Sequence, residues 1–398
     1  MLSKRILSIE ESATLAMTAK SAALKLEGKN VINLSIGEPD FDTPDFIKQE
    51  AIKAINENFT HYTPVAGIME LRKAICKKLL RDNGVEYKPE QIVVSTGAKQ
   101  AIANVLMSMI DPDDEVVVAS PYWVSYSEMV KLSEGTVKLI EAGIENDFKI
   151  TAKQLDEAIS AKTKMVMLNS PCNPTGSVYT KEELKALAEV IDKHKHVYVI
   201  SDEIYEHIIF SGKHESFAQF ESIKDRVIII NGVSKGFAMT GWRLGFSASS
   251  TPIAKACIKL QGQITSNTNS IAQKAAVAAF EKDPADIPEL KIMVKKFHER
   301  RDLLLDLLKE VPGVKTNVPD GAFYVFADFS SYYGKSDGNT LIKNDEDLCM
   351  YILDTVFVAL VPGGAFGDKN CIRFSYATSN ENLIEAVERV KTLLAKLK

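Results

Sequence analysis

Two adjacent side chains that could each act as a nucleophile stand in the segment VIIINGVSKGF, residues 227–237. Gly232, Ser234 and Gly236 complete the pattern G-x-S-x-G, in which serine hydrolases place their catalytic serine on a sharp turn. Lys235 stands beyond the same apolar run, where its amine could instead form a Schiff base with a carbonyl group. The two side chains predict two different enzymes.

The serine lacks the partners that a hydrolase requires. A hydrolase of this type carries an acid and then a histidine further along the chain. The only histidine after Ser234 is His298, in the charged segment KKFHERRD, which is typical of an exposed helix face. We therefore interpret His298 as a surface residue. We attribute the glycines of the pattern to a sharp turn and to a close approach to a phosphate.

The lysine has companions that suit a phosphate-bearing cofactor. Asp202 follows another apolar run and could be a buried anion, and Arg243 carries a planar guanidinium suited to phosphate. Gly97 and Ala98 precede a helical pattern, so their N–H groups could bind the same phosphate. Pyridoxal phosphate needs a lysine such as Lys235, a phosphate site, and a carboxylate that keeps its ring nitrogen protonated.

Each companion also has a purely structural interpretation. Asp202 could cap a helix, and Asn173, in NPTG, could be a turn residue. Tyr205 and Trp123 could be core residues. Singly, these interpretations equal or outweigh a functional one, but their occurrence together after successive strands favours a site.

Seven short apolar runs between residues 91 and 248 predict the strands that position these residues. They are QIVVS, EVVVAS, TVKLIEA, KMVMLNS, HVYVIS, RVIIING and LGFSAS. Most lack alternation, as expected of strands buried on both faces. Helical patterns lie between several of them, and one begins with a capping box formed by Thr180 and Glu183. The alternation predicts an α/β domain with a largely parallel sheet, whose ligands bind beyond the carboxyl ends of the strands.

A change of pattern after residue 250 predicts a second, smaller domain. Two long helical patterns are interrupted by prolines, and PDGAFYVFADFS, a polar insert and a final helix from about Asn382 follow. We predict a large domain over residues 45–285. Residues 1–44 and 286–398 would form a smaller α+β domain.

Composition indicates an ordinary globular protein. The 398 residues are 45% hydrophobic and 25% charged, with a net charge of -5, which gives no electrostatic case for binding nucleic acid or anionic membranes. Five scattered cysteines without a C-x-x-C pair indicate reduced thiols in a cytoplasmic protein and no metal site. We expect no signal peptide and no membrane span.

Seven longer motifs resemble those of the class I/II, fold type I aminotransferases. They are LSIGEPDFDTP, HYTPVAGIMELRKAI, SPYWVSYSEMV, NSPCNPTG, SDEIYEHI, SKGFAMTGWRLGF and IRFSYATS, and they span nearly the whole chain. Within the family the chain is similar to the bacterial-type aspartate aminotransferases of subgroup Ib. The resemblance implies the α/β fold of PLP-dependent transferases of fold type I, with a mainly parallel seven-stranded sheet in the large domain.

The resemblance assigns the residues around the cofactor ring. It implies that Lys235 forms the internal aldimine with pyridoxal 5′-phosphate and then acts as the base. Asp202 would pair with the ring nitrogen, and Tyr205 and Asn173 would hydrogen-bond the ring oxygen. Trp123 would stack on the ring.

The resemblance also assigns a phosphate site that two subunits share. Arg243 and the backbone at Gly97 and Ala98 would hold the phosphate, and the hydroxyl of Ser234 would assist. Tyr62 would reach the phosphate of the other subunit, which implies a homodimer with active sites at the interface.

The substrate site follows from the same resemblance. Arg373 would bind the α-carboxylate and the backbone of Gly37 would close over the substrate. The animal-type branch binds the distal carboxylate of aspartate through an arginine of the neighbouring subunit, but residues 244–299 contain no arginine. In subgroup Ib, Lys99 of the GAKQ motif, beside the phosphate loop, would take that part. Ser12 and Thr14 would help at the same carboxylate.

The function implied is transamination of L-aspartate with 2-oxoglutarate by a ping-pong mechanism, giving oxaloacetate and L-glutamate. Prephenate is an alternative, although prephenate-using relatives often carry a basic residue where this chain has Glu10 and Glu11. Alanine, aromatic or kynurenine transamination, or a related lyase or synthase, are further alternatives. We do not expect a regulator of this fold, because such a protein normally carries a fused DNA-binding domain, for which the N-terminal region here is too short. A serine hydrolase acting through Ser234 remains the only alternative outside PLP chemistry that has a sequence motif.

Overall fold

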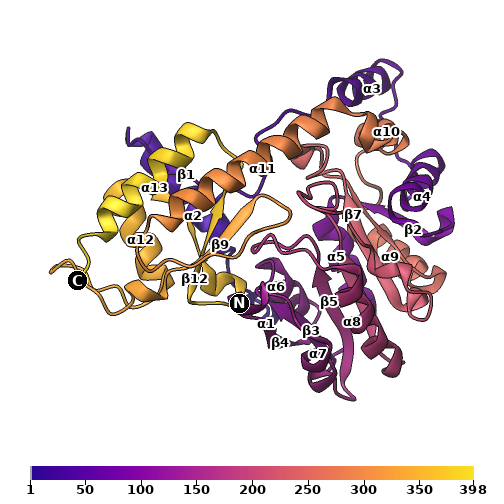
Figure 1. Cartoon of the computed structure of the whole chain (residues 1–398). Coiled ribbons are helices and arrows are strands. Elements are labelled where there is room, and N and C mark those ends of the chain that lie inside the picture. Colours follow the sequence, from indigo (N-terminus) through magenta and orange to yellow (C-terminus); the bar gives the residue numbers. More distant parts are fainter. Residues whose placement is uncertain (1) are drawn as a thin grey trace.

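A seven-stranded sheet forms the centre of the larger part of the computed structural model, which describes residues 2–398 (Figure 1). Its strands are β2 (Ile92–Ser95), β3 (Glu115–Ser120), β4 (Thr136–Glu141), β5 (Thr163–Asn169), β6 (Tyr198–Asp202), β7 (Val227–Gly232) and β8 (Gly245–Ala248). Their order is β2-β8-β7-β6-β5-β3-β4, and β8 is antiparallel to both of its neighbours. Every predicted run is a strand, so the predicted mainly parallel seven-stranded sheet is confirmed.

Helices cover both faces of this sheet, which explains why its strands lack alternation. Ile92 and Val94 face one hydrophobic core and Val93, between them, faces another. Helices α4, α8 and α10 contribute to the first core, and α5, α6 and α9 to the second. The helices of this part are α3 (Asp45–Asn56), α4 (Met69–Asn83), α5 (Ala98–Met109), α6 (Ser125–Leu132), α7 (Ala152–Ala158), α8 (Lys181–Lys193), α9 (Thr251–Ile264) and α10 (Ser270–Glu281).

The smaller part has its own sheets and its own core. Strands β9 (Tyr324–Asp328), β11 (Val361–Pro362) and β12 (Cys371–Ser375) form an antiparallel sheet, and β1 (Ile32–Asn33) pairs in parallel with β10 (Val358–Ala359). Its helices are α1 (Lys4–Leu7), α2 (Ala13–Leu26), α11 (Pro288–Lys309), α12 (Asp345–Val356) and α13 (Asn380–Leu394). The long helix α11 runs from the neighbourhood of α10 to this sheet (Figure 1). The domain limits at residues 45 and 285 stay a prediction.

Local sequence signals account for several helix starts. The hydroxyl of Thr180 accepts from the N–H of Glu183, whose carboxylate accepts from the N–H of Thr180, so the predicted capping box is present at α8. Helix α13 begins two residues before the predicted Asn382, because the Ser379 hydroxyl accepts from the N–H of that residue and caps the helix.

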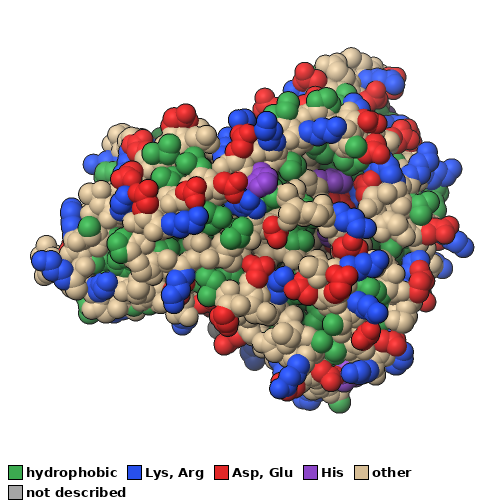
Figure 2. Space-filling view, in the orientation of Figure 1, with side chains coloured by type: hydrophobic (Ala, Val, Ile, Leu, Met, Phe, Trp, Pro, Cys, Tyr) green, Lys and Arg blue, Asp and Glu red, His purple; other side chains and the backbone are tan. Residues whose placement is uncertain are grey.

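The surface charge, the cysteines and the helices can be compared with the predictions from composition. Figure 2 shows acidic and basic side chains interspersed over the face in view. All five cysteines are free thiols. Within residues 2–398, no helix is both long enough and apolar enough to cross a lipid bilayer.

Glycines allow β7, β8 and the start of α5 to pack unusually close together. Gly232 and Gly245 lie opposite each other in the β7–β8 pair, and a Cβ on Gly232 would lie 2.8 Å from the Cα of Gly245. A Cβ on Gly245 would lie 2.3 Å from the backbone nitrogen of Ala98. A Cβ on Gly236 would lie 2.7 Å from the ring of His207. Residues 234–238 form a turn after β7, but neither Gly232 nor Gly236 has a positive φ, so close packing is what requires glycine at these two positions.

Replacing Gly245 by alanine should destabilise the protein. The new methyl group would meet backbone atoms of α5, which cannot rotate away, so we expect the free energy of unfolding to fall by about 1–3 kcal/mol. Urea unfolding followed by circular dichroism would measure the change.

Gly262→Ala is the matched control. Gly262 lies within α9, and its new methyl group would meet only the Val65 side chain, at an ordinary 3.8 Å. This substitution should raise the free energy of unfolding by about 0.5–1 kcal/mol, because alanine is the better helix former. Equal effects of the two substitutions would contradict the packing argument.

Candidate active site

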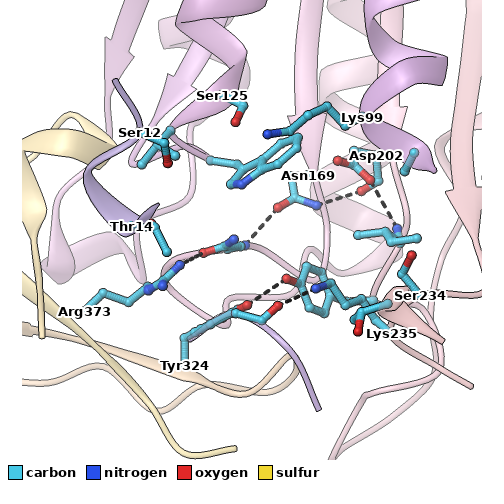
Figure 3. Close-up of a pocket in the computed structure, with 18 of the residues that line it drawn as sticks. Ser12, Thr14, Lys99, Ser125, Asn169, Asp202, Ser234, Lys235, Tyr324 and Arg373 are labelled. Carbon is cyan, nitrogen blue, oxygen red and sulfur yellow. Dashed lines mark hydrogen bonds between the residues drawn. The ribbon is translucent and has the colours of Figure 1, made fainter. Parts of the chain in front are cut away.

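A cavity of about 280 Å³ opens beyond the carboxyl ends of β5, β6 and β7 (Figure 3). It brings together every site residue predicted from the sequence except Gly97, which adjoins it, and Tyr62. Ser12, Thr14 and Arg373 approach it from the smaller part, and Asp202, Ser234 and Lys235 lie at the opposite end (Figure 3). The predicted residues that line it are Ser12, Thr14, Gly37, Ala98, Lys99, Trp123, Asn173, Asp202, Tyr205, Ser234, Lys235, Arg243 and Arg373.

Lys235 follows β7 and directs its amine into the cavity. Desolvation by the surrounding protein lowers the pKa of Lys235 to about 8; the carboxylate of Glu38 opposes this shift, and the cations of Arg373 and Arg243 add to it. The amine donates a hydrogen bond to the backbone carbonyl of Gly37. Part of this amine is therefore neutral near physiological pH, as a base or a nucleophile requires.

Asp202 is the last residue of β6 and is buried. The hydroxyl of Tyr126 donates to its Oδ2 at 2.7 Å, and the N–H of Ile204 donates to its Oδ1 at 3.3 Å. Burial raises the pKa of Asp202 to about 6, although the Tyr126 hydrogen bond opposes the shift. The carboxylate is therefore largely ionised at pH 7. Asp202 precedes a turn and caps no helix.

Arg373 is a buried cation held by neutral groups. It lies on β12 with 1% of its surface exposed, donates from Nη1 to Oδ1 of Asn173 at 3.0 Å, and donates from Nη2 to the Ser35 carbonyl at 2.7 Å. Its Nε has no hydrogen-bond partner within residues 2–398. Because its oxygen accepts from Arg373, the amide of Asn173 keeps its NH₂ group available as a donor.

The start of α5 and Arg243 form a second polar wall. Gly97 is the N-cap of α5 with φ +84°, and a Cβ there would lie 2.4 Å from Nη2 of Arg243. Glycine at this position therefore lets the guanidinium lie against the helix N-terminus. The Ser234 side chain is buried beside the same cavity. N–H groups at a helix start, together with a guanidinium, form an anion site.

Positive charge is in excess at the cavity. Lys99, Lys235, Arg243 and Arg373 line it, but the only carboxylate among the lining residues of the described chain is Asp202. None of these four cations forms a salt bridge within residues 2–398. An unpaired cation is costly where water is excluded, as at Arg373, so the cavity is suited to an anionic ligand.

Comparison with known proteins identifies the family. A model of the family described as aminotransferase class I and II matches residues 29–390.

The chain belongs to the class I and II aminotransferases.

Relatives of this aminotransferase are similar over its full length. It is 49% identical over 399 residues to the bifunctional aspartate aminotransferase and glutamate/aspartate-prephenate aminotransferase of Petunia hybrida, covering 100% of this chain and 83% of the relative. It is 44% identical over 400 residues to the aspartate/prephenate aminotransferase of Nitrosomonas europaea, covering 99% and 100% of the two chains. The crystal structure of an aspartate aminotransferase from Rhizobium meliloti superposes with a TM-score of 0.96 at 42% identity, covering 100% of both chains. The fold and family predicted from the sequence are confirmed.

The structure places the residues predicted for the distal carboxylate at the cavity mouth of this aminotransferase. The ammonium of Lys99 lies 4.9 Å from the ring centre of Trp123, and desolvation, followed by the Arg243 charge, lowers the pKa of Lys99. Ser12 is the N-cap of α2, but its hydroxyl makes no capping hydrogen bond, so it remains available to a ligand. It lies opposite Lys99, near Thr14 (Figure 3).

Ser234 has no histidine partner in the aminotransferase. No histidine is among the cavity-lining residues of the described chain. His298 is 42% exposed on α11, where it stacks on Phe210, as the surface interpretation predicted. The arrangement therefore excludes a Ser-His hydrolase at Ser234.

Tyr62 lies away from the cavity of its own chain. Its side chain is 92% exposed and is not among the lining residues. A single chain therefore gives Tyr62 no contact with its own site.

Five polar residues at the site were missed in the sequence: Ser125, Asn169, Thr240 and Tyr324 line the cavity, and Tyr126 contacts Asp202. Asn169, at the end of β5, donates to the Asp202 carbonyl at 2.8 Å and accepts from the N–H of Asn173 at 2.8 Å. The rule that ligands bind beyond strand ends could have found it. Tyr126 and Tyr324 carry no such signal, because only the tertiary structure brings their hydroxyls to Asp202 and Tyr205.

A buried cluster outside the cavity consists of Glu203, Glu206 and His214. The ammonium of Lys78 lies 2.5 Å from Glu206, and its charge lowers the pKa of that carboxyl against the effect of burial. Lys78 therefore compensates one of the two carboxylates of this cluster, that of Glu206. The expectation that no metal is bound stays a prediction.

The lowered pKa of Lys235 predicts a pH-dependent stability difference between cofactor-free wild type and Lys235→Met. Between pH 8 and 10, the lysine is mostly neutral in the folded chain but still charged in the unfolded chain. The unfolded state therefore binds more protons, so wild-type stability should rise relative to the variant by up to about 1.4 kcal/mol per pH unit. Urea unfolding at several pH values would measure the difference. A difference independent of pH over this range would contradict a lowered pKa.

Proposed function

We propose that this aminotransferase binds pyridoxal 5′-phosphate in the cavity and transfers the amino group of L-aspartate to 2-oxoglutarate, giving oxaloacetate and L-glutamate. The observation that carries the proposal is the charge imbalance. The cations of Lys99, Lys235, Arg243 and Arg373 face one carboxylate, that of Asp202. A phosphate and the carboxylates of an amino acid are the anions that would balance them.

The residues present fit this cofactor. Asp202 is buried without a salt bridge within residues 2–398, so a protonated ring nitrogen would supply the cation that it lacks. Arg243, the backbone at Gly97 and Ala98, and the hydroxyl of Ser234 would hold the phosphate. When bound, the cofactor supplies an aldehyde that forms a Schiff base and a ring that accepts electrons.

Four side chains of the cavity would orient the cofactor and move the proton. Trp123 would stack on the ring, and the NH₂ group of Asn173 and the hydroxyl of Tyr205 would donate to its ring oxygen. The Nζ of Lys235 would attach to the cofactor in the resting enzyme. Once displaced by the substrate amine, it would take the proton from the substrate Cα, because its lowered pKa leaves it partly neutral.

Separate residues would bind the two carboxylates of aspartate. The guanidinium of Arg373 would bind the α-carboxylate, and the Gly37 backbone would close over it. Lys99, assisted by the hydroxyls of Ser12 and Thr14, would bind the distal carboxylate as a single positive charge. Both relatives described above carry aspartate in their names, which supports this substrate.

Prephenate is the second candidate substrate, because the Petunia and Nitrosomonas relatives are also named for it. Prephenate carries two carboxylates, like aspartate, so the same cations would bind it. A donor panel of aspartate, alanine, tyrosine and phenylalanine with 2-oxoglutarate, and a reverse assay of prephenate with aspartate or glutamate, would distinguish the candidates. Double-reciprocal plots should give parallel lines, as expected of ping-pong kinetics, and intersecting lines would contradict a ping-pong mechanism.

We also propose a homodimer with shared active sites. The exposure of Tyr62 supports this proposal, since a second chain would give that side chain a phosphate to contact. The location in the cytoplasm and the absence of nucleic-acid and membrane partners stay predictions.

Replacing Lys235 by alanine tests the cofactor. The purified wild type should be yellow or become yellow with pyridoxal phosphate, and Lys235→Ala should lose the visible band of the lysine-bound cofactor and its transaminase activity. Absorbance spectra would measure this. Lys153→Ala, a change at an exposed lysine away from the cavity, should leave both unchanged. A wild type that stays colourless with added cofactor would refute the cofactor proposal.

Replacing Lys99 by alanine tests the distal carboxylate site. Loss of a charge-assisted contact should lower kcat/KM for aspartate by about 10- to 100-fold and leave alanine nearly unaffected. Steady-state kinetics over the donor panel would measure both. Equal losses for the two substrates would show that Lys99 does not recognise the distal carboxylate.

A further inference from the structure

Tyr324 is a buried residue of the cavity to which the preceding sections assign no role. It is the first residue of β9 in the smaller part and has no exposed surface. It nevertheless contacts three residues with proposed roles, namely Tyr205, Gly37 and Arg373. These contacts come from two different parts of the side chain.

The hydroxyl of Tyr324 lies between Tyr205 and the Gly37 backbone. Its oxygen is 2.9 Å from the hydroxyl oxygen of Tyr205, and a Cβ on Gly37 would lie 3.0 Å from it. Within residues 2–398, the two phenols are each other's only hydrogen-bond partners. Two hydroxyls carry two protons and one hydrogen bond uses one of them, so one proton is left for a ligand.

The ring of Tyr324 supports the guanidinium of Arg373. The Cζ atom of Arg373 lies 4.6 Å from the ring centre of Tyr324 and 4.9 Å from that of Phe366. Aromatic faces attract a cation, most strongly where water is excluded, and Arg373 has 1% of its surface exposed. The two rings therefore help to keep this arginine charged and in place without a carboxylate partner.

We propose that Tyr324 is a positioning residue whose hydroxyl acts on the cofactor end of the site and whose ring acts on the carboxylate end. This rests on the proposed function, in which Tyr205 donates to the ring oxygen of pyridoxal phosphate. The Tyr324 hydroxyl donates to the Tyr205 oxygen and so leaves the Tyr205 proton directed into the cavity. The Tyr324 ring holds the Arg373 guanidinium for the substrate carboxylate.

A double-mutant cycle tests the hydroxyl. Tyr324→Phe keeps the ring and should raise the dissociation constant of pyridoxal phosphate from the cofactor-free enzyme by about three- to tenfold, the effect of one hydrogen bond. In a Tyr205→Phe background the same change should alter it by less than about twofold, because the hydroxyl then has no phenol to orient. Absorbance titration measures all four constants. If Tyr324→Phe loses no affinity for pyridoxal phosphate, or loses the same affinity in both backgrounds, the proposed role of the hydroxyl is overturned.

Succinate binding to the cofactor-saturated enzyme tests the ring. This dicarboxylate lacks the amine and reports on carboxylate binding alone. Its dissociation constant should be unchanged within about twofold in Tyr324→Phe and should rise about threefold or more in Tyr324→Leu, which loses the face over Arg373. Equal binding by the Leu and Phe variants, measured by isothermal titration calorimetry, would overturn the ring's role.

Tyr332→Phe is the matched control for both measurements. Its hydroxyl is also hydrogen-bonded, donating to the Pro312 carbonyl at 2.6 Å, but it lies outside the cavity. It should change stability without changing either dissociation constant. A wild type that binds no pyridoxal phosphate would refute the proposed function itself. A wild type that binds it, with Tyr324 variants that behave like Tyr332→Phe, would refute only the inference about Tyr324.

Discussion

Positive charge without salt-bridge partners around one cavity is the constraint on which the rest of this structure depends. Four cations face one carboxylate, and none of the four forms a salt bridge within residues 2–398. Such an arrangement is unfavourable for the ligand-free chain, and the surrounding fold must stabilise it. Neutral groups do much of this, as at Arg373, which two aromatic rings, an amide oxygen and a carbonyl oxygen hold in place.

The sheet supplies the geometry because parallel strands deliver their carboxyl ends to one edge. Asn169, Asp202 and Lys235 come from successive strands or from just beyond them, and two hydrophobic cores, one on each face, fix those strands. Gly232 and Gly245 bring the start of α5 close to the same edge. Close packing, more than any flexibility of the chain, therefore builds the site.

Burial shifts the pKa values of Lys235 and Asp202 in opposite directions, and both groups thereby become useful near neutral pH. Desolvation disfavours the charged form of each, so it lowers the pKa of Lys235 to about 8 and raises that of Asp202 to about 6. At pH 7 the acid is still mostly ionised and the amine is partly neutral. The same low-polarity surroundings therefore supply a base and retain a carboxylate.

The sequence by itself determined the strands, the family, and most of the residues that line the cavity, because strand ends and motifs are local patterns. Lys235, Asp202, Asn173 and Arg373 were all predicted, and the structure brings them to one cavity. Only the tertiary structure decided what depends on contacts between distant segments. It showed that Gly232 serves close strand packing and that Tyr126 and Tyr324 hold Asp202 and Tyr205. A hydrogen bond between residues more than seventy positions apart leaves no spacing in the sequence from which it could be predicted.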